Sequence, residues 1–237
     1  MRILITNDDG IGAPGLSRLA RAATRFGEVT VIAPREQSSA MSHHVTFDRS
    51  MMLQKTDYPV SGVRAFTLDG TPADCVRASY LGMLDELPEA VLSGINDGAN
   101  VGYDILYSAT IGAGMEGLLY HVPVICFSQL SGGTDETADH YLPLMIEELF
   151  CRDAGPGNLW NVNFPCCSLS ECRGVLYDRT LEKEALYDDV YTRVLLPEGG
   201  WRVDLATDLR SGAAPGTDME AIFRNYVSVG KIHNPAL

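Results

Sequence analysis

Two adjacent carboxylates, Asp8 and Asp9, follow directly after the short apolar run at residues 2–6. Neighbouring carboxylates repel each other unless a cation lies between them, and hard oxygen ligands of this kind suit Mg²⁺, Mn²⁺ or Ca²⁺. A bound cation would turn a loop that repels anions into one that attracts them. The acid pair therefore predicts a metal site that could receive a phosphate group.

The same loop has other interpretations, because from Gly10 onward it spells G-x-G-x-x-G, with Glu36 about twenty residues beyond the motif. That pattern is typical of a turn that binds NAD(P). Two carboxylates would then lie beside the diphosphate with no lysine near them in the sequence, and at ~4 Å each charge pair repels by about 1 kcal/mol even in bulk water. The four residues from Asn7 to Gly10 could also form a turn with no further role. An NAD(P)-dependent oxidoreductase is kept as an alternative.

Covalent phosphate chemistry on an aspartate is disfavoured. A haloacid-dehalogenase-type phosphatase needs Asp-x-Asp, but Asn7 stands two residues before Asp9, and an amide cannot form an acyl phosphate. A receiver domain needs a lysine after its last strand, and no lysine lies between Lys55 and Lys183. Water activated by a metal fits the residues better. A non-catalytic, receiver-like module that binds metal or phosphate is the second alternative.

Three further loops are expected to reach the same edge of a sheet as the acid pair. The first, residues 33–44, contains two adjacent histidines that could act as general acid or base or could simply be exposed. The second, residues 93–102, is rich in glycine and could supply Asn96 as an oxygen ligand. The third, residues 107–117, places small residues at a helix start, where backbone N–H groups can bind a phosphate.

The elements that must position these loops alternate through the first 150 residues. Short, fully apolar runs are typical of a parallel sheet covered on both faces. The expected strands are 3–6, 29–33, 65–68, 90–93 and 122–127. Helices should begin at Pro14 and after the capping residue Thr71, and an apolar stripe with helical spacing runs from 138 to 150. The predicted fold class is α/β, with a Rossmann-like, mostly parallel sheet sandwiched by helices, and ligands should bind beyond the carboxyl ends of its strands.

From residue 151 the pattern changes to short extended pieces separated by turns. These pieces are 159–163, 173–177, 190–196 and 226–232. We therefore divide the chain into a Rossmann-like catalytic core, residues 1–150, and a β-rich C-terminal extension, residues 151–237. Hairpins of such extensions often pair between subunits, so we expect an oligomer.

The chain carries a formal net charge of -13. Such an acidic chain repels polyanions, and we expect it to bind neither a nucleic-acid duplex nor a membrane. No apolar run approaches the ~20 residues of a membrane-spanning helix, and the N-terminus begins with a strand rather than with a signal sequence. The expected location is cytoplasmic.

The motifs above form, together with several others, one ordered series that extends along most of the chain. The others are Ala13-Pro14-Gly15, Asp69-Gly70-Thr71-Pro72-Ala73-Asp74, Met115-Glu116-Gly117, Asn161-Val162-Asn163 and Tyr226-Val227-Ser228-Val229. Taken with Asn7-Asp8-Asp9-Gly10, Ser93-Gly94-Ile95-Asn96 and Tyr107-Ser108, this series resembles the SurE family, the stationary-phase survival proteins that act as metal-dependent nucleotidases.

The resemblance implies one divalent cation per subunit, Mg²⁺ or Mn²⁺, held by two carboxylates, a hydroxyl and an amide. The implied ligands are Asp8, Asp9, Ser39 and Asn96. The resemblance also implies phosphate contacts at the helix start within residues 107–117. We expect further phosphate contacts from the loop that carries the acid pair. The expected phosphate contacts are Asn7, Gly10, Ser108 and Thr110. Nucleoside 5′-monophosphates, and often 3′-monophosphates, are the implied substrates, and a homodimer or homotetramer is the implied assembly.

Some positions depart from the family pattern. Arg35 stands where an aspartate is usual, Ser38 where an arginine or similar polar residue is common, Ala109 where a glycine is usual, and residues 230–232 where Thr-Pro-Leu is usual. The implied metal ligands are intact, so the reaction class is kept. The preferred nucleotide and the details of the phosphate contacts are left open.

The expected reaction is hydrolysis of a phosphomonoester by a water that the cation activates. Asp8 and Asp9 are the expected catalytic residues, since either could take the proton of that water. The sequence does not choose between them.

Overall fold

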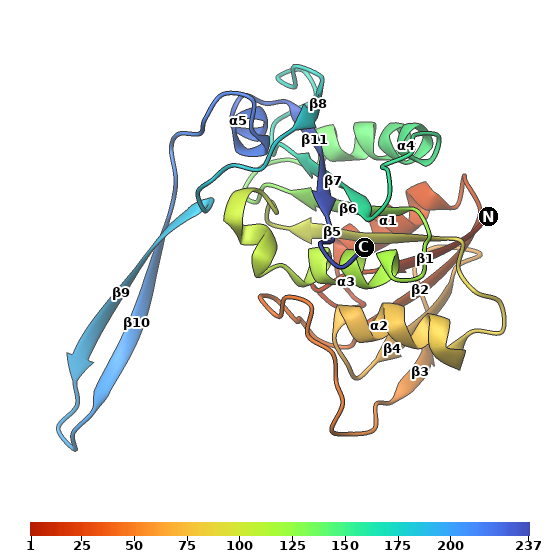
Figure 1. Ribbon diagram of the computed structural model, residues 1–237, viewed down its shortest axis with the longest axis horizontal. Coiled ribbons are helices and arrows are strands. Elements are labelled where there is room, and N and C mark those ends of the chain that lie inside the picture. The colour runs from red at the N-terminus through yellow and green to blue at the C-terminus, as the bar shows by residue number, and fades with distance from the viewer.

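A nine-stranded sheet forms the centre of the computed structural model, which describes all 237 residues (Figure 1). The strand order is β3-β4-β2-β1-β5-β6-β7-β11-β8. The six parallel strands at its middle are β4 (Arg64–Leu68), β2 (Glu28–Pro34), β1 (Arg2–Thr6), β5 (Ala90–Asp97), β6 (Val124–Gln129) and β7 (Asn158–Phe164). At one edge β3 (Leu53–Thr56) is antiparallel to β4. At the other, β11 (Val227–His233) is antiparallel to β7, and β8 (Val175–Arg179) is parallel to β11.

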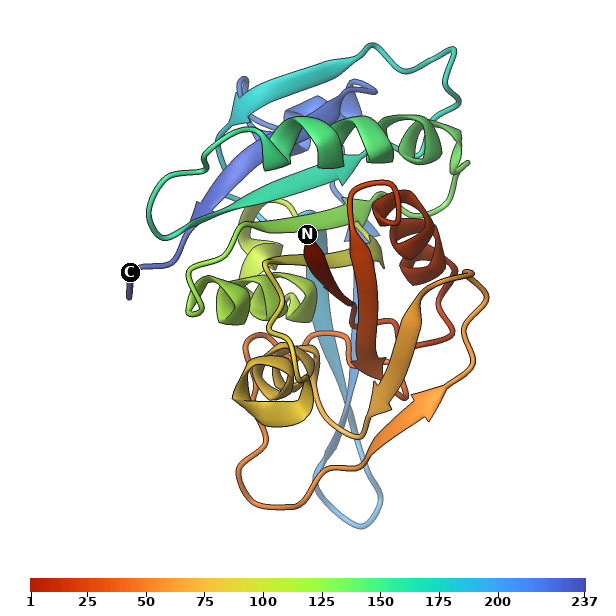
Figure 2. The same ribbon diagram turned by 90° about the vertical axis from the view of Figure 1, so that its right-hand side faces the viewer.

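Helices cover both faces of this sheet, with α1 on one side and α2 and α3 on the other (Figure 2). One face carries α1 (Pro14–Ala23) and α4 (Glu136–Phe150). The other carries α3 (Ala109–Leu118) and α2 (Pro72–Ala78), which continues into one more turn over Ser79–Met83. A 3₁₀ turn over Gly102–Leu106 precedes α3, and α5 (Asp218–Phe223) precedes β11.

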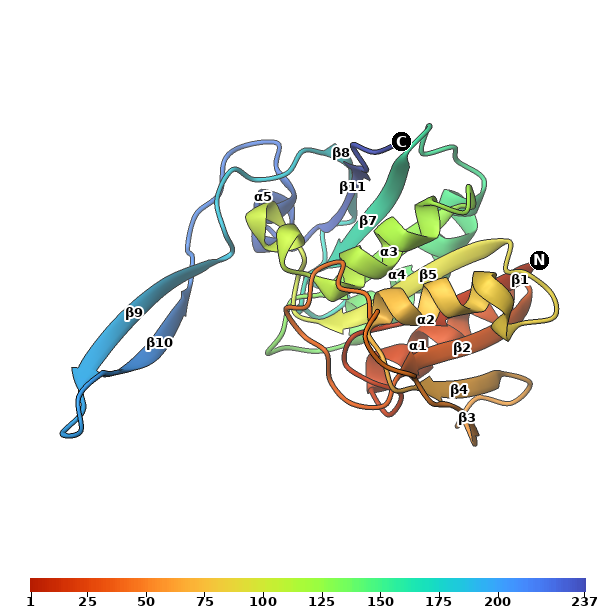
Figure 3. The same cartoon turned by 60° about the horizontal axis from the view of Figure 1, so that its bottom comes forward.

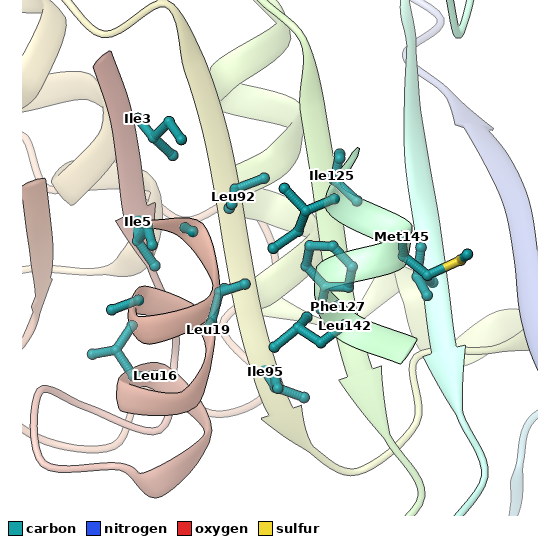
Figure 4. Close-up of a cluster of buried hydrophobic side chains, with 14 of the residues drawn as sticks. Ile3, Ile5, Leu16, Leu19, Leu92, Ile95, Ile125, Phe127, Leu142 and Met145 are labelled. Atoms are coloured by element: carbon teal, nitrogen blue, oxygen red, sulfur yellow. The ribbon is translucent and has the colours of Figure 1, made fainter. Parts of the chain in front are cut away.

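Each of these faces has its own apolar core. Figure 4 shows the larger one, in which side chains of α1 and α4 pack on those of β1, β5 and β6. Among the completely buried members are Ile5, Leu16, Leu19, Leu92, Ile125 and Phe127. The two-sided burial explains why these strands are continuous apolar runs.

Local sequence signals set the starts of two helices. Pro14 occupies the first turn of α1, where its missing N–H leaves no hydrogen bond unmade. Thr71 caps α2 through a capping box, since its hydroxyl accepts from the backbone N–H of Asp74 and the Asp74 carboxylate accepts from the N–H of Thr71. Both starts agree with the sequence-based predictions.

A long hairpin, β9 (Tyr187–Leu195) and β10 (Trp201–Leu209), projects away from the body (Figure 3). The two strands pair only with each other, and all their residues after Tyr187 are exposed. The exposed set includes large apolar side chains: Val190, Tyr191, Val194, Leu195, Trp201, Val203, Leu205 and Leu209. A two-stranded ribbon with apolar residues on its surface is typical of an element that packs against another surface.

The fold class predicted from the sequence is confirmed, with corrections to individual elements. The fifth expected strand begins at Val124 rather than at residue 122, because Pro123 has no N–H to donate to a neighbouring strand, and it continues to Gln129. The expected strand 173–177 is shifted to Val175–Arg179, and 190–196 to Tyr187–Leu195. The strands β3 and β10 and the helix α5 were not predicted.

The C-terminal segment contributes β7, β11 and β8 to the central sheet and extends the hairpin from it. The division of the chain into residues 1–150 and 151–237 stays a prediction. None of the helices combines the length and the apolar character that a membrane-spanning helix needs.

Candidate active site

The acid pair lies just beyond the end of β1, a central strand of the sheet. Asp8 follows β1, which lies between β2 and β5, and its side chain is almost completely buried. Thr110 in the first turn of α3 donates a hydrogen bond from Oγ1 to Asp8 Oδ1 at 2.6 Å. Burial raises the pKa of Asp8 to about 6; the Thr110 hydrogen bond opposes this rise, and the charge of Asp9 adds to it. A negative charge on Asp8 is therefore unfavourable unless something positive balances it.

Asp9 is less buried and is held from the neighbouring strand. The backbone N–H of Asp97, at the end of β5, donates to Asp9 Oδ2 at 3.0 Å. Burial raises the pKa of Asp9, the hydrogen bond from Asp97 lowers it, and the charge of Asp97 raises it. Asn96 precedes Asp97, and its Nδ2 donates to the carbonyl of Gly98 at 2.7 Å, so its amide oxygen is the atom left for a ligand.

The loop after β2 passes beside the acid pair. The backbone N–H of Ser38 donates to the carbonyl oxygen of Asp8 at 2.7 Å. Gly10, with a φ of +91°, lies against the backbone of residues 35–37. Ser39 follows directly, with an exposed side chain whose Oγ accepts from Gln37 Nε2 at 3.0 Å. The loop therefore places Ser39 next to the contact with Asp8.

The residues expected to contact phosphate lie around the same point, but several already have structural partners. Asn7 donates from Nδ2 to the carbonyl of Gly10 at 3.0 Å, while its buried Oδ1 has no partner. Ser108 caps α3 by accepting from the N–H of Ile111 at 3.1 Å. The hydroxyl proton of Thr110 is engaged by Asp8. In this arrangement Thr110 orients a carboxylate, a role that the sequence alone did not predict.

The donor set fits a hard divalent cation. The hydrogen bonds to Asp8 and Asp9 each use one carboxylate oxygen and leave the other, and a hydroxyl and an amide oxygen lie on the adjoining loops. No group of three or more His, Cys, Asp or Glu side chains is placed to hold a metal, so a cation here would have two carboxylates and otherwise neutral oxygen ligands. That composition suits Mg²⁺ or Mn²⁺. A cation would also relieve the charge that burial makes unfavourable.

A hydrogen-bonded network around Glu116, which the sequence did not predict, connects the Ser39 loop to α3. The carboxylate of Glu116, 3% exposed, accepts from Tyr120 Oη at 3.1 Å and Arg77 Nη1 at 3.4 Å and pairs with His43 Nε2 at 2.8 Å. One residue before His43, the N–H of Ser42 donates to the carbonyl of Tyr107 at 2.9 Å. The available sequence signal was a single carboxylate within an otherwise apolar helix.

The glycines of the G-x-G-x-x-G spelling have packing roles. A Cβ added at Gly15 would lie 2.2 Å from the carbonyl oxygen of Ile95, so α1 approaches β5 too closely for a side chain. Gly10 needs its positive φ. Glu36, the expected ribose-binding acid of the dinucleotide interpretation, is exposed. The glycine spacing is therefore explained without a dinucleotide.

Two departures from the family pattern also have structural partners. Arg35 donates from Nη2 to Gln54 Oε1 at 2.6 Å and so ties the loop to the edge strand β3. Gly230 in β11 lies close to β8, since an added Cβ would be 2.6 Å from the carbonyl oxygen of Arg179. Ala109, the first residue of α3, is completely buried.

Comparisons of the sequence and of the structure with known proteins all find SurE proteins. A family model described as survival protein SurE matches residues 3–186. The 5′-nucleotidase SurE of Pseudomonas savastanoi pv. phaseolicola is 39% identical over 234 residues, which cover 97% of this chain and 90% of that protein. The 5′-nucleotidase SurE of Moorella thermoacetica is 35% identical over 238 residues, covering 98% and 90%. The crystal structure of the SurE protein from Aquifex aeolicus superposes with a TM-score of 0.84 at 31% identity, covering 98% of this chain and 93% of that one.

Proposed function

The chain belongs to the SurE family, and we propose that it is a metal-dependent phosphomonoesterase that hydrolyses nucleoside 5′-monophosphates, and also 3′-monophosphates, to nucleoside and phosphate. The observation that carries the proposal is the acid pair at the end of β1, where Asp8 is almost completely buried and the hydrogen-bond donors are the Thr110 hydroxyl and the Asp97 N–H rather than cations. Relatives over nearly the whole length of the chain are named 5′-nucleotidases. Their name supports the substrate class, and the acid pair supports the need for a cation.

Four side chains would hold one divalent cation, Mg²⁺ or Mn²⁺, in each subunit. They are Asp8, Asp9, Ser39 and Asn96. When bound, such a cation neutralises charge on a phosphate and lowers the pKa of a water. The protein's own contribution is to fix these oxygens before substrate arrives, because Thr110 and the N–H of Asp97 hold the two carboxylates from different elements.

Proton transfer is assigned to the acid pair. Asp9 is the less buried of the two, and its Oδ1 is left by the hydrogen bond from Asp97, so Asp9 can reach a water more readily than Asp8. The N-terminus of α3 and the loop at Gly10 would stabilise negative charge on the phosphate oxygens. At Ser108 only the hydroxyl proton is available for this, since its oxygen already caps the helix.

The hairpin β9–β10 is proposed as the subunit contact of a homodimer or homotetramer. Its large apolar side chains are exposed in the single chain, and it pairs with no other strand. An apolar surface of this kind is normally covered by another molecule. The cytoplasmic location inferred from the sequence stays a prediction.

Phosphate release tests the function directly. The purified protein is given a panel of nucleoside 5′- and 3′-monophosphates with Mn²⁺ or Mg²⁺, and again with EDTA. We expect release that requires the metal and that Asp8→Asn abolishes. Asp85→Asn, an exposed carboxylate before the amino end of β5 and therefore away from the strand ends that carry the acid pair, is the matched control and should leave the rate unchanged. Release that persists with EDTA, or full activity in Asp8→Asn, would contradict the metal role.

A further inference from the structure

We propose that the nucleoside half of the substrate binds in one cleft beside the acid pair and that Arg18 is the residue against which the base packs. We call it the Arg18 cleft, between the start of α1, the end of β5 and the loop 130–135. This inference rests on the proposed phosphomonoesterase function and names the part of the molecule that recognises the substrate.

The Arg18 cleft begins at the site itself. Asp9 and Asn96, two of the proposed metal ligands, form part of its wall, and so does Gln37 of the loop that carries Ser39. Its volume of about 480 Å³ lies in the range of about 300–1,000 Å³ that is usual for small-molecule sites. A phosphate ester bound at the acid pair would therefore have its leaving group directly at the entrance to this space.

A second cleft, of about 530 Å³, lies between the loop 34–49 and residues 68–71. None of the proposed metal ligands lines it. Its wall includes Arg49, which pairs with Asp69 at 3.0 Å. The Arg18 cleft is therefore the better candidate for binding the nucleoside, which is covalently attached to the phosphate.

The protein contacts of Arg18 engage the nitrogens at the edge of its guanidinium group, so the flat face of the group is the part available to a ligand. Its side chain is 18% exposed, and its nitrogens are occupied along the edge: Nε by Asp139 at 2.6 Å, and Nη1 by Asp135 at 2.9 Å and Gln129 at 3.3 Å. An arginine whose edge donors are satisfied still offers a flat face, and such faces stack on aromatic rings. A nucleobase is an aromatic ring of suitable size.

The charge of the cleft favours an uncharged, polar group. Asp9, Asp97 and Asp135 line it, while its one cation, Arg18, is already paired. A second phosphate would be repelled there, whereas ribose hydroxyls and base N–H groups could donate to the exposed carboxylate of Asp97. The cleft should therefore select nucleoside monophosphates over esters with a further anionic group.

The test blocks the cleft without touching the acid pair. Ser131 lines its mouth and is exposed on the loop after β6, so Ser131→Trp should fold normally. Ser61→Trp, in the exposed turn before the amino end of β4 and therefore at the opposite end of the strands from the cleft, is the matched control. Arg18→Met is a second variant, which keeps an apolar stem and removes the planar group.

Steady-state kinetics with Mn²⁺ compare adenosine 5′-monophosphate with ribose 5-phosphate, which lacks the base. In Ser131→Trp and Arg18→Met we expect KM for the nucleotide to rise at least tenfold, with kcat little changed and kcat/KM for ribose 5-phosphate within threefold of the unmodified protein. Equal losses for both substrates, or no loss for either, would overturn the proposal.

Calorimetric titration with adenosine alone separates this proposal from the proposed function. If the unmodified protein hydrolyses no phosphate ester, the phosphomonoesterase function fails. Binding of adenosine that Ser131→Trp abolishes and Ser61→Trp preserves would still support the cleft. Adenosine binding that is equal in all three proteins, or absent from all three, would refute it.

Discussion

Replacing Glu116 with glutamine should destabilise the fold by about 1–3 kcal/mol, the usual cost of leaving a buried hydrogen-bonding group without a good partner. The Glu116 carboxylate is 3% exposed and is surrounded by donors from His43, Arg77 and Tyr120. Glutamine keeps the shape but loses the charge and turns its own N–H groups toward those donors. For a domain of this size about 2–4 °C of melting temperature corresponds to 1 kcal/mol, so we expect the melting temperature to fall by roughly 2–12 °C.

The sign of the pH dependence follows from the same contacts. Burial raises the pKa of Glu116, but hydrogen bonds from His43 and Tyr120 and the charges of His43 and Arg77 outweigh it, so the pKa lies below the ordinary value of 4.5. A carboxylate whose pKa is lowered by folding contributes stability above its unfolded pKa and loses it as the pH falls through the folded value. The difference in free energy of unfolding between the unmodified protein and Glu116→Gln should therefore be largest above pH 4.5 and should decrease as the pH falls below it.

Urea unfolding of the unmodified protein and of Glu116→Gln across this pH range measures the difference in free energy of unfolding. An exposed ion pair supplies the control. Glu28 pairs with Arg64 at 2.9 Å, with side chains 55% and 51% exposed. Exposed pairs contribute about 0–1 kcal/mol, so Glu28→Gln should change little. A loss in Glu116→Gln no larger than that in Glu28→Gln, or a gap that widens in acid, would refute the reasoning.

Three more changes have defined outcomes. Gly15→Ala should prevent correct packing of α1, because the new Cβ would lie 2.2 Å from the carbonyl oxygen of Ile95, whereas Gly12→Ala meets nothing within 4 Å and should fold normally; circular dichroism of the soluble fractions compares them. Asp8→Asn should raise the melting temperature in EDTA above pH 6, where the unmodified carboxylate is charged against its raised pKa of about 6, and should abolish stabilisation by Mn²⁺. Replacing residues 187–209 by a short glycine-serine turn should leave the melting temperature of the body within about 3 °C and yield a monomer by light scattering, since Arg210 N–H already bonds the carbonyl of Leu186 across the hairpin base.

The central strands could be predicted because burial on both faces makes them continuous apolar runs, as in β1, β2 and β6. Edge and exposed strands carry no such signal. Residues Leu53–Thr56 of β3 are half exposed and too few to show a pattern. β10 is exposed along its whole length but carries Trp201, Val203, Leu205 and Leu209 on alternate positions, a strand signal that the prediction did not use. The helix α5 has only six residues, too few for helical periodicity to appear.

In the candidate site, residues that are adjacent in sequence could be predicted, whereas contacts between distant residues could not. Asp8 and Asp9 are adjacent in sequence and follow a recognisable strand, so their type and position could be inferred directly. The partner of Asp8 is Thr110, 102 residues away, and Glu116 meets His43 across 73 residues. Such pairs depend on which helix lies over which strand, and one sequence does not specify that. The family resemblance named Thr110, but as a phosphate contact, whereas its hydroxyl proton is directed at a carboxylate.

Helix α3 is the element that makes the site one unit. Its first turn holds Asp8 through Thr110, and its middle holds the Ser39 loop, because Gly112 lies against the carbonyl of Ser42 and Glu116 pairs with His43. Two of the proposed metal ligands, from loops after different strands, are therefore positioned by one rigid helix. A shift of α3 would move both at once, so substitutions on its buried face should weaken cation binding even though the helix itself supplies none of the proposed ligands.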